Sequence, residues 1–361
     1  MSEAPGRLNE PHADRRSLNP VTETSCKSIN LALQGGGAHA AFAWGVLDRL
    51  LEDERIEIEG ISATSAGAMN GACVAYGLAT GGRDGARRVL AAFWGRIADM
   101  AAWSPLQPSW YDRFSRNWNL EWSPAFFAFD MAARLFSPYE FNPLNLNPLR
   151  EALLASVDFG KLQQGTSTVR LFLAATNVRT GRIKIFQGAE ISADAVLASA
   201  CLPFLFQAVE IDGEHYWDGG YMGNPAIFPL IYGCNSRDVV IVHVNPVERP
   251  ELPCTARGIL NRVNEISFNS SLMREMRAIH FVTDLIESGQ IAEGRMKRML
   301  IHAICADELM MQLGTRSKLN ASRDFLAHLH DNGRVYAEAW LRASFGHLGE
   351  RSTIDLQSRY L

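Results

Sequence analysis

The chain has 361 residues, of which 47% are hydrophobic and 20% charged, the balance of a globular protein with a sizeable core. Its formal net charge of −4 argues against nucleic acid as a partner, because nucleic-acid binding relies on dense positive charge. The six cysteines show no CxxC spacing, which disfavours both a metal site and a disulfide framework.

The N-terminal residues 1–26 are polar and interrupted by prolines, and we expect them to form a disordered tail. They contain no apolar run like that of a secretory signal or membrane anchor. No later segment reaches the roughly 20 unbroken apolar residues that a spanning helix needs. We therefore expect a cytoplasmic location, and export by a dedicated secretion system is the alternative left open.

A strand–turn–helix unit follows the tail. Apolar residues alternate with smaller ones over 29–33, which predicts a buried strand. The glycine run Gly35-Gly36-Gly37 then predicts a turn, and apolar residues recur at helical spacing over 42–51.

A second unit of the same kind comes directly afterwards. Residues 58–63 predict a strand, Thr64-Ser65 a sharp turn, and residues 66–76 a helix of small residues. Gly81-Gly82 ends this helix, and Asp84 is a suitable cap for another helix that runs to about residue 97.

Residues 103–141 are rich in aromatic side chains and follow no clear period. One interpretation is a lid or an apolar groove beside a binding site. The alternative is core packing beneath a long loop.

Strand signals dominate the next part of the chain. A helix is predicted to start at Asn147-Pro148. Two hairpins are also expected, one formed by 171–178 with 183–186 and the other by 209–211 with 215–217. Residues 239–244 predict a buried strand, and 299–304 predict a final strand within a mainly helical C-terminal part. Strands that alternate with helices predict a three-layer α/β core.

Ser65 is a candidate nucleophile. It lies between a predicted strand and a predicted helix, within Ala63-Thr64-Ser65-Ala66-Gly67. Small neighbours allow a tight turn that exposes the hydroxyl at the edge of a sheet, the arrangement of a nucleophile elbow. The plainer alternative is a serine that caps the helix.

The glycine run Gly35-Gly36-Gly37 is a candidate oxyanion hole. Glycine tolerates the dihedral angles that turn successive amides toward one point, and the following helix adds its positive end. A structural turn and a phosphate-binding loop of a dinucleotide fold are the alternatives. The second lacks the full G-x-G-x-x-G order and an acidic ribose partner.

Asp218 is a candidate base. It follows a short predicted strand and precedes Gly219-Gly220, so its carboxylate can project from the strand end. An ordinary aspartate, with a pKa near ~3.9, is a poor base unless burial raises that value, and nearby aromatic residues offer such burial. A simple turn is the alternative.

The motifs Gly35-Gly36-Gly37-Ala38-His39-Ala40, Ala63-Thr64-Ser65-Ala66-Gly67 and Asp218-Gly219-Gly220 occur in this order in the chain. Their order and context resemble the patatin-like phospholipase family, and bacterial members in particular. The resemblance covers roughly residues 28–245, and the C-terminal part resembles an extension found in a bacterial subset.

This resemblance implies a catalytic Ser65–Asp218 dyad without histidine, with Gly35, Gly36 and Gly37 as the oxyanion hole and with no metal or cofactor. It implies a three-layer α/β/α fold with a central, mostly parallel sheet. The expected organisation is a catalytic domain over 27–245, which contains the aromatic lid or groove at 103–141, and a mostly helical extension over 246–361. The expected substrate is a lipid or lysolipid ester, cleaved by phospholipase A, lysophospholipase or carboxylesterase activity, with peripheral membrane contact.

The chain departs from the family pattern at Ala40 and Ala63, where the family has glycine. A single added methyl can overpack a tight site at a cost of ~1–3 kcal/mol. Two alternatives therefore stay open beside hydrolysis: acyl transfer by the same dyad, and a weakly active or inactive lipid-binding protein. The oligomeric state is left open.

Two histidines are candidates for catalytic roles. His243 ends a predicted strand and would complete a Ser65–Asp218–His243 triad, although a buried structural residue is the better interpretation. His39 lies beside the glycine turn, where it could assist electrostatically, but we expect it to be exposed to solvent.

Overall fold

The computed structural model describes residues 26–104, 112, 115, 117–120, 123–164, 167–292 and 294–361. The predicted tail, apart from residue 26, lies outside this part of the chain. So do four aromatic residues of the 103–141 segment, namely Trp110, Tyr111, Phe114 and Trp122.

One eight-stranded sheet forms the middle of the molecule, with the strand order β5-β6-β3-β2-β1-β7-β8 and β4 paired to β3. The four pairings among β3, β2, β1, β7 and β8 are parallel, whereas β4, β5 and β6 add antiparallel pairs at the β3 side. The strands are β1 Lys27–Leu33, β2 Ile56–Ala63, β3 Arg170–Asn177, β4 Ile183–Gln187, β5 Val209–Ile211, β6 Glu214–Asp218, β7 Asp238–Val242 and β8 Leu300–Ile304.

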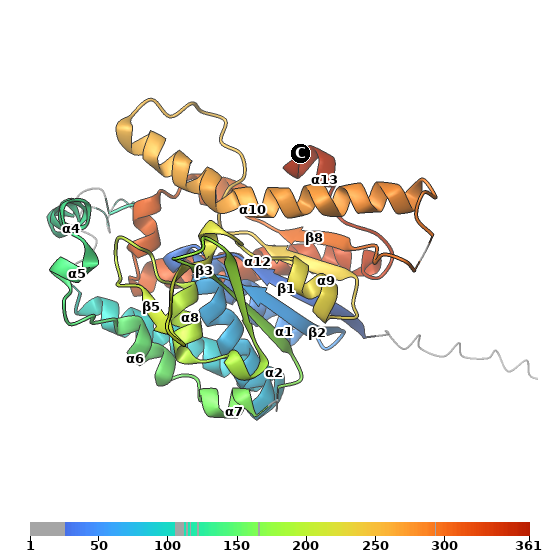
Figure 1. Ribbon diagram of the computed structural model, residues 1–361, viewed down its shortest axis with the longest axis horizontal. Coiled ribbons are helices and arrows are strands. Elements are labelled where there is room, and N and C mark those ends of the chain that lie inside the picture. Colours follow the sequence, from blue (N-terminus) through green and yellow to red (C-terminus); the bar gives the residue numbers. More distant parts are fainter. Residues whose placement is uncertain are drawn as a thin grey trace, which may run out of the picture.

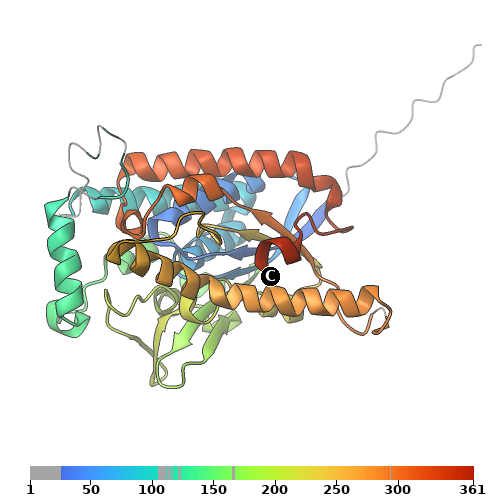
Figure 2. The ribbon, with the colours of Figure 1, turned by 90° about the horizontal axis from the view of Figure 1, so that it is seen from above.

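Helices cover both faces of this sheet, so the fold is a three-layer α/β/α arrangement (Figure 1). Seen from above, α12 and α10 lie on opposite sides of the strands (Figure 2). The longer helices are α1 Ala40–Glu52, α2 Ala66–Ala102, α4 Pro124–Leu135, α10 Ala256–Glu287 and α12 Arg323–Ser344. The shorter ones are α5 Pro138–Phe141, α6 Pro148–Leu154, α7 Phe159–Gln163, α8 Ala193–Ser199, α9 Phe228–Gly233, α11 Asp307–Met311 and α13 Leu356–Tyr360.

The apolar runs of the central strands follow from this double cover. Successive side chains of a strand point to opposite faces, so a strand buried on both faces needs apolar residues throughout. Leu31 and Leu33 of β1 belong to the hydrophobic cluster beneath α1, α2 and α12, whereas Ala32 belongs to the cluster beneath α9 and α10. Both clusters are buried, and together they hold the sheet between its two helical layers.

The predicted elements agree well with the structure. Both hairpins are confirmed, as β3 with β4 and as β5 with β6. Asn147 caps α6 by accepting a hydrogen bond from the Leu149 amide. The break predicted at Gly81-Gly82 is a kink with non-helical dihedral angles inside α2. Beyond the kink, α2 runs to Ala102, further than predicted, because apolar side chains continue to face the core up to Ala98.

The C-terminal residues contribute to the same sheet and its cover. The predicted strand near 299–304 is β8, which pairs in parallel with β7. Helix α12 packs on α1 so closely that a Cβ atom added at Gly45 would lie 1.9 Å from the His330 carbonyl oxygen. None of the helices in the described ranges combines the length and the apolar character needed to cross a bilayer.

Candidate active site

Ser65 lies in a strained turn between β2 and α2. Its backbone has φ 57° and ψ −128°, a left-handed conformation that non-glycine residues rarely adopt. The turn also requires Gly67, because a Cβ atom there would lie 2.6 Å from the Leu33 carbonyl oxygen. The Ser65 amide donates to the Ser199 hydroxyl at 2.9 Å, which anchors the turn to α8. This strand–turn–helix geometry is that of a nucleophile elbow.

The glycine turn contacts Ser65 directly. Because β1 and β2 pair in parallel with Leu33 opposite Ala63, the segments that follow them emerge at the same edge of the sheet. A Cβ atom added at Gly35 would lie 2.4 Å from the Ser65 Cβ. Any side chain at position 35 would therefore displace the serine.

Asp218 is the last residue of β6 and is fully buried. Its Oδ1 accepts a hydrogen bond from the Gly220 amide at 2.7 Å, and its Oδ2 has no hydrogen-bond partner within the described ranges. Burial raises the pKa of Asp218 to about 6, against the opposing effects of the Gly220 amide, the Ser65 hydroxyl and the Lys318 ammonium. The structure thus brings the predicted serine and aspartate together, close enough for the Ser65 hydroxyl to lower the pKa of the Asp218 carboxyl group.

The turn after Asp218 depends on its two glycines. A Cβ atom at Gly219 would lie 2.1 Å from the Ala174 carbonyl oxygen, and one at Gly220 would lie 2.2 Å from the Phe268 ring. The Asp218 backbone is held from both sides, because its amide donates to the Cys201 carbonyl at 2.8 Å and its carbonyl accepts from Thr176 Oγ1 at 2.8 Å.

The predicted oxyanion hole needs one correction. The Gly35 amide donates to Asn224 Oδ1 at 2.7 Å in a buried position, so it is already engaged. The Gly36 and Gly37 amides have no acceptor among the described residues, and neither has the amide of Ala66, which follows Ser65. An amide directly after a nucleophile commonly contributes to an oxyanion hole. The Gly35 amide is therefore not free to donate to an oxyanion in this structure, and the Ala66 amide is a further candidate donor that the sequence did not indicate.

A buried amide network holds the glycine turn in place. Gln34 Oε1 accepts from the Val244 and Asn245 amides, and its Nε2 donates to Asn269 Oδ1 at 3.2 Å. Asn245 Nδ2 in turn donates to the Gly35 carbonyl at 2.7 Å. The sequence analysis missed these residues as well as Asn224. Two of them could have been found from their positions in the sequence. Asn224 and Asn245 each directly precede a proline; Asn224 follows the Asp218-Gly219-Gly220 motif, and Asn245 follows the predicted strand 239–244.

Lys318 reaches the same site from the C-terminal part of the chain. It lies in the 3₁₀ helix Thr315–Leu319, and its Nζ donates to Asn245 Oδ1 at 2.7 Å. Partial burial lowers the pKa of Lys318 to about 8, although the Asp218 charge opposes that shift. A Cβ atom at Gly37, which has φ +58°, would lie 2.4 Å from the Lys318 carbonyl oxygen. Nothing in the local sequence around Lys318 indicates this position.

Neither histidine contacts the serine or the aspartate. His243 is buried and its Nε2 lies 2.6 Å from the Tyr360 hydroxyl, so it is a structural residue rather than a triad member. The expectation that His39 is exposed was wrong: it is 2% exposed, and its Nε2 lies 2.7 Å from the Ser317 hydroxyl. Burial, together with the Lys318 charge, holds the pKa of His39 well below its usual value. His39 therefore joins the glycine turn to the C-terminal part.

The two alanines that replace family glycines are accommodated. Ala40 and Ala63 are both fully buried. The Ala63 methyl group faces Gly71 of α2, where an added Cβ atom would lie 3.3 Å away. The absence of a side chain at position 71 thus leaves room for the methyl group at position 63.

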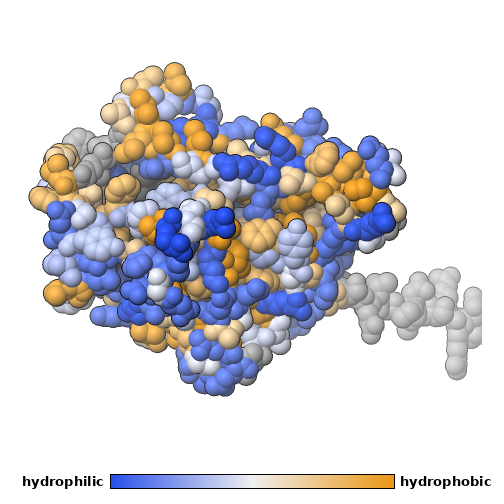
Figure 3. Space-filling model, in the orientation of Figure 1, coloured by the Kyte–Doolittle hydropathy of each residue, from blue (hydrophilic) through white to orange (hydrophobic). Residues whose placement is uncertain are grey.

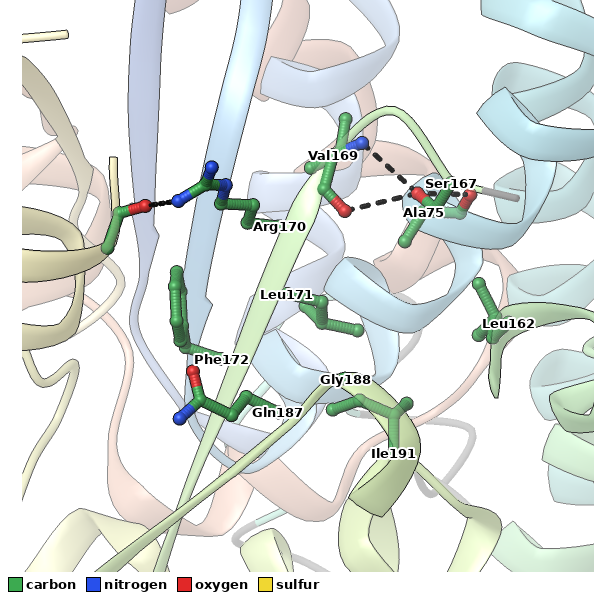
Figure 4. Close-up of a pocket in the computed structure, with 11 residues that line it drawn as sticks. Ala75, Leu162, Ser167, Val169, Arg170, Leu171, Phe172, Gln187, Gly188 and Ile191 are labelled. Atoms are coloured by element: carbon green, nitrogen blue, oxygen red, sulfur yellow. Dashed lines mark hydrogen bonds between the residues drawn. The ribbon is translucent and has the colours of Figure 1, made fainter. Parts of the chain in front are cut away.

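A separate pocket of about 380 Å³ lies at the start of β3 (Figure 4). Because Gly60 pairs with Arg170 and Ala63 with Leu173, this pocket lies toward the opposite end of β2 and β3 from Ser65. Two of its polar side chains are already paired: Ser167 donates to the Ala75 carbonyl and Arg170 to the Gly233 carbonyl. This pocket therefore has no part in the candidate active site.

The chain matches the family described as patatin-like phospholipase over residues 31–231. No curated protein matches it.

Among solved structures, VipD from Legionella pneumophila shares 16% identity with a TM-score of 0.42, over 87% of this chain and 66% of that one. The type III effector protein ExoU shares 13% identity with a TM-score of 0.32, over 87% of this chain and 53% of that one. ExoU from Pseudomonas aeruginosa in complex with SpcU shares 15% identity with a TM-score of 0.28, over 92% of this chain and 73% of that one. This chain thus spans 66% of VipD and 53% of ExoU in the first two comparisons. Since the family match covers more than half of the sequence, the chain belongs to the patatin-like phospholipase family.

Proposed function

We propose that the protein hydrolyses carboxylic esters of lipids through an acyl-enzyme formed on Ser65, with Asp218 as the base. The observation that carries this proposal is the position of Ser65, in a strained turn against Gly35 and close enough to the buried Asp218 to affect the pKa of its carboxyl group.

The chemistry proceeds in two stages. Ser65 Oγ attacks the ester carbonyl carbon while Asp218 accepts its proton, and the Gly36, Gly37 and Ala66 amides donate to the oxyanion that develops. The intermediate then collapses, and the departing alkoxide takes the proton from Asp218. A water molecule, deprotonated by Asp218, next attacks the acyl-enzyme, which releases the fatty acid and restores the serine.

Exposed apolar side chains at the catalytic end support a lipid substrate and peripheral membrane contact. The C-terminal ends of β1 and β2, α4 and the N-terminal part of α10 all lie toward the left of Figure 1. Orange residues gather over the raised part of α10 and at the left-hand end of the molecule (Figure 3). The exposed residues on these segments are Phe127, Met131, Leu135, Phe136, Tyr139, Ile259, Leu260, Val263 and Ile266. An apolar surface of this kind suits a membrane interface.

The aromatic segment over 103–141 contributes to this surface only in part. Trp118 stacks on Phe325 and His328 and so belongs to the packed interior, whereas Phe127 and Tyr139 are exposed. We propose that α4 and α5 contact lipid, whereas Trp118 packs against α12 in the interior.

The test is labelling with a fluorophosphonate probe, followed by assays on esters of graded acyl length. Wild-type protein is expected to take up one label at Ser65, and Ser65→Ala to take up none. Asp218→Asn is expected to lower kcat by at least roughly 10³-fold, because the general base is lost. Ser358→Ala, which removes an exposed serine, serves as the control and is expected to behave as wild type. Unchanged turnover in both Ser65→Ala and Asp218→Asn would exclude the dyad.

A further inference from the structure

A second, larger pocket lies between α9, α10 and the segment that leads into β8. Its volume is about 700 Å³, within the range of small-molecule sites. Phe228 and Ile231 of α9 line one wall, Ile279 and Val282 of α10 line another, and Met299 lies where β8 begins. The interior of this pocket is therefore mainly apolar.

Basic side chains stand at the rim of this pocket. Arg274 of α10 and Arg295 are both exposed, and neither forms an ion pair with any residue that the structure describes. Lys297 donates to the Cys234 carbonyl oxygen. The acidic residue in the lining, Glu275, turns its Oε2 to the Ile227 and Phe228 amides at 2.9 and 2.7 Å. An apolar interior with two unpaired guanidinium groups at its rim matches a ligand that has one anionic head and one apolar chain.

This pocket is separate from the candidate active site. Neither Ser65, Asp218 nor the glycine turn lines it. The near end of the pocket, at Met222 and Ser271, adjoins the residues that hold the glycine turn. Its far end lies further along α10: Phe268 contacts the Gly220 turn, Ile279 lines the pocket, and a helix rises ~1.5 Å per residue, which puts about 16 Å between these two positions.

We propose that this pocket binds a long-chain fatty acid. Its carboxylate pairs with Arg274 and Arg295 at the rim, and its alkyl chain lies along Phe228, Ile279 and Met299. A carboxylate accepts bidentate hydrogen bonds from guanidinium groups, and a pocket of this volume holds one chain rather than a two-chain lipid. This inference does not depend on the chemistry at Ser65.

The experiment is calorimetric titration of the full chain with palmitate, 1-hexadecanol or hexanoate, the first two below their solubility limits. It is run on wild type and on Ser65→Ala, so that turnover does not affect the binding signal. We expect palmitate to bind at one site per chain in both proteins. Hexadecanol lacks the charge and hexanoate lacks most of the chain, so each is expected to bind at least roughly tenfold more weakly.

Variants assign the binding to this pocket. The double variant Arg274→Glu/Arg295→Glu reverses the rim charge and is expected to weaken palmitate binding by at least roughly tenfold. Val282→Trp fills the interior and is expected to abolish binding. Arg277→Glu is the matched control, because Arg277 is exposed on the same helix but does not line the pocket, and it is expected to bind as wild type.

Thermal unfolding of each variant checks that it is folded. The charge-reversal variants change exposed residues, so they are the least able to disturb the core. Palmitate binding that survives both the charge reversal and Val282→Trp would overturn the proposal, as would equal affinity for palmitate and hexadecanol. An inactive protein that still binds palmitate in this pocket would contradict the proposed hydrolysis and leave the pocket assignment standing.

Discussion

At the level of single residues, the candidate site combines a strained serine with an aspartate whose acidity is altered by burial. Ser65 is 8% exposed, whereas Asp218 is 0% exposed. Removing a carboxylate from water disfavours its charged form, which is why the pKa of Asp218 rises to about 6. A base with that pKa accepts a proton more readily than an ordinary aspartate does.

The first prediction concerns pH. In the proposed mechanism Asp218 accepts a proton only when it is ionised, so kcat/KM is expected to fall as the pH decreases through about 6. Lys318→Met removes a positive charge that lowers the pKa of Asp218. The pH at which kcat/KM falls is therefore expected to be higher in this variant than in wild type. Profiles of kcat/KM against pH for wild type and Lys318→Met are the measurement. Lys184→Met, which removes a surface ion pair with Glu190, is the control, and identical limbs in all three proteins would contradict the electrostatic argument.

The second prediction concerns stability. Because the pKa of Asp218 is about 6 when folded and ~3.9 when unfolded, its neutral form favours the folded state, and this contribution is lost as the pH rises through about 6. Above that pH, Asp218→Asn is expected to increase the free energy of unfolding by up to ~3 kcal/mol, from about two pKa units at ~1.4 kcal/mol each. Below pH ~3, where Asp218 is protonated in both the folded and the unfolded state, the difference is expected to vanish. Urea unfolding at both pH values measures it, and an Asn variant that is less stable at high pH would count against this account.

At the level of elements, helices position the proposed catalytic groups through hydrogen bonds to the turns. Ser199, the last residue of α8, accepts from the Ser65 amide. Ser271 of α10 accepts from the Asn224 amide at 3.2 Å, and Asn224 accepts from the Gly35 amide. The elbow and the glycine turn thus depend on helices that approach the sheet from opposite sides.

The third prediction tests the anchor on α8. Ser199→Ala removes the acceptor of the Ser65 amide, so the elbow is expected to lose its alignment and kcat to fall roughly 10- to 100-fold with little change in KM. Ser192→Ala removes the N-cap of the same helix and is expected to cost ~1 kcal/mol of stability without a comparable loss of kcat. Steady-state kinetics and thermal unfolding of both variants separate positioning from stability. A purely structural role for Ser199 would make the two variants alike.

At the level of the whole molecule, the C-terminal part is packed into the α/β/α core. Strand β8 extends the sheet, Lys318 reaches the glycine turn, and α12 crosses α1 at two glycines. A Cβ atom at Gly45 would lie 1.9 Å from the His330 carbonyl oxygen, and one at Gly333 would lie 2.1 Å from the Phe42 carbonyl oxygen. The two helix backbones are therefore in direct contact.

The fourth prediction tests this helix crossing. Gly333→Val is expected to separate α12 from α1 and to lower the free energy of unfolding by about 3 kcal/mol or more, because backbone atoms cannot move aside as side chains do. Gly95→Ala, in α2, meets no atom within 4 Å and is expected to raise it by about 0.5–1 kcal/mol. Chemical denaturation measures the free energy of unfolding of both variants, which is expected to fall for Gly333→Val and to rise for Gly95→Ala. Equal stability for Gly333→Val and wild type would show that the contact is dispensable.

The sequence by itself determined the local elements and the candidate residues. Periodicity and turn residues are properties of neighbouring positions, so the two strand–turn–helix units, the hairpins and the strand before Asp218 could be predicted without coordinates. The tertiary structure alone decided which of these positions meet. Gly35 and Asn224 are 189 residues apart in the chain, and Lys318 and Asn245 are 73 apart. The engaged Gly35 amide, the buried His39 and the Lys318 charge beside Asp218 all arise from such distant contacts, because strand order and packing, rather than local pattern, bring those residues together.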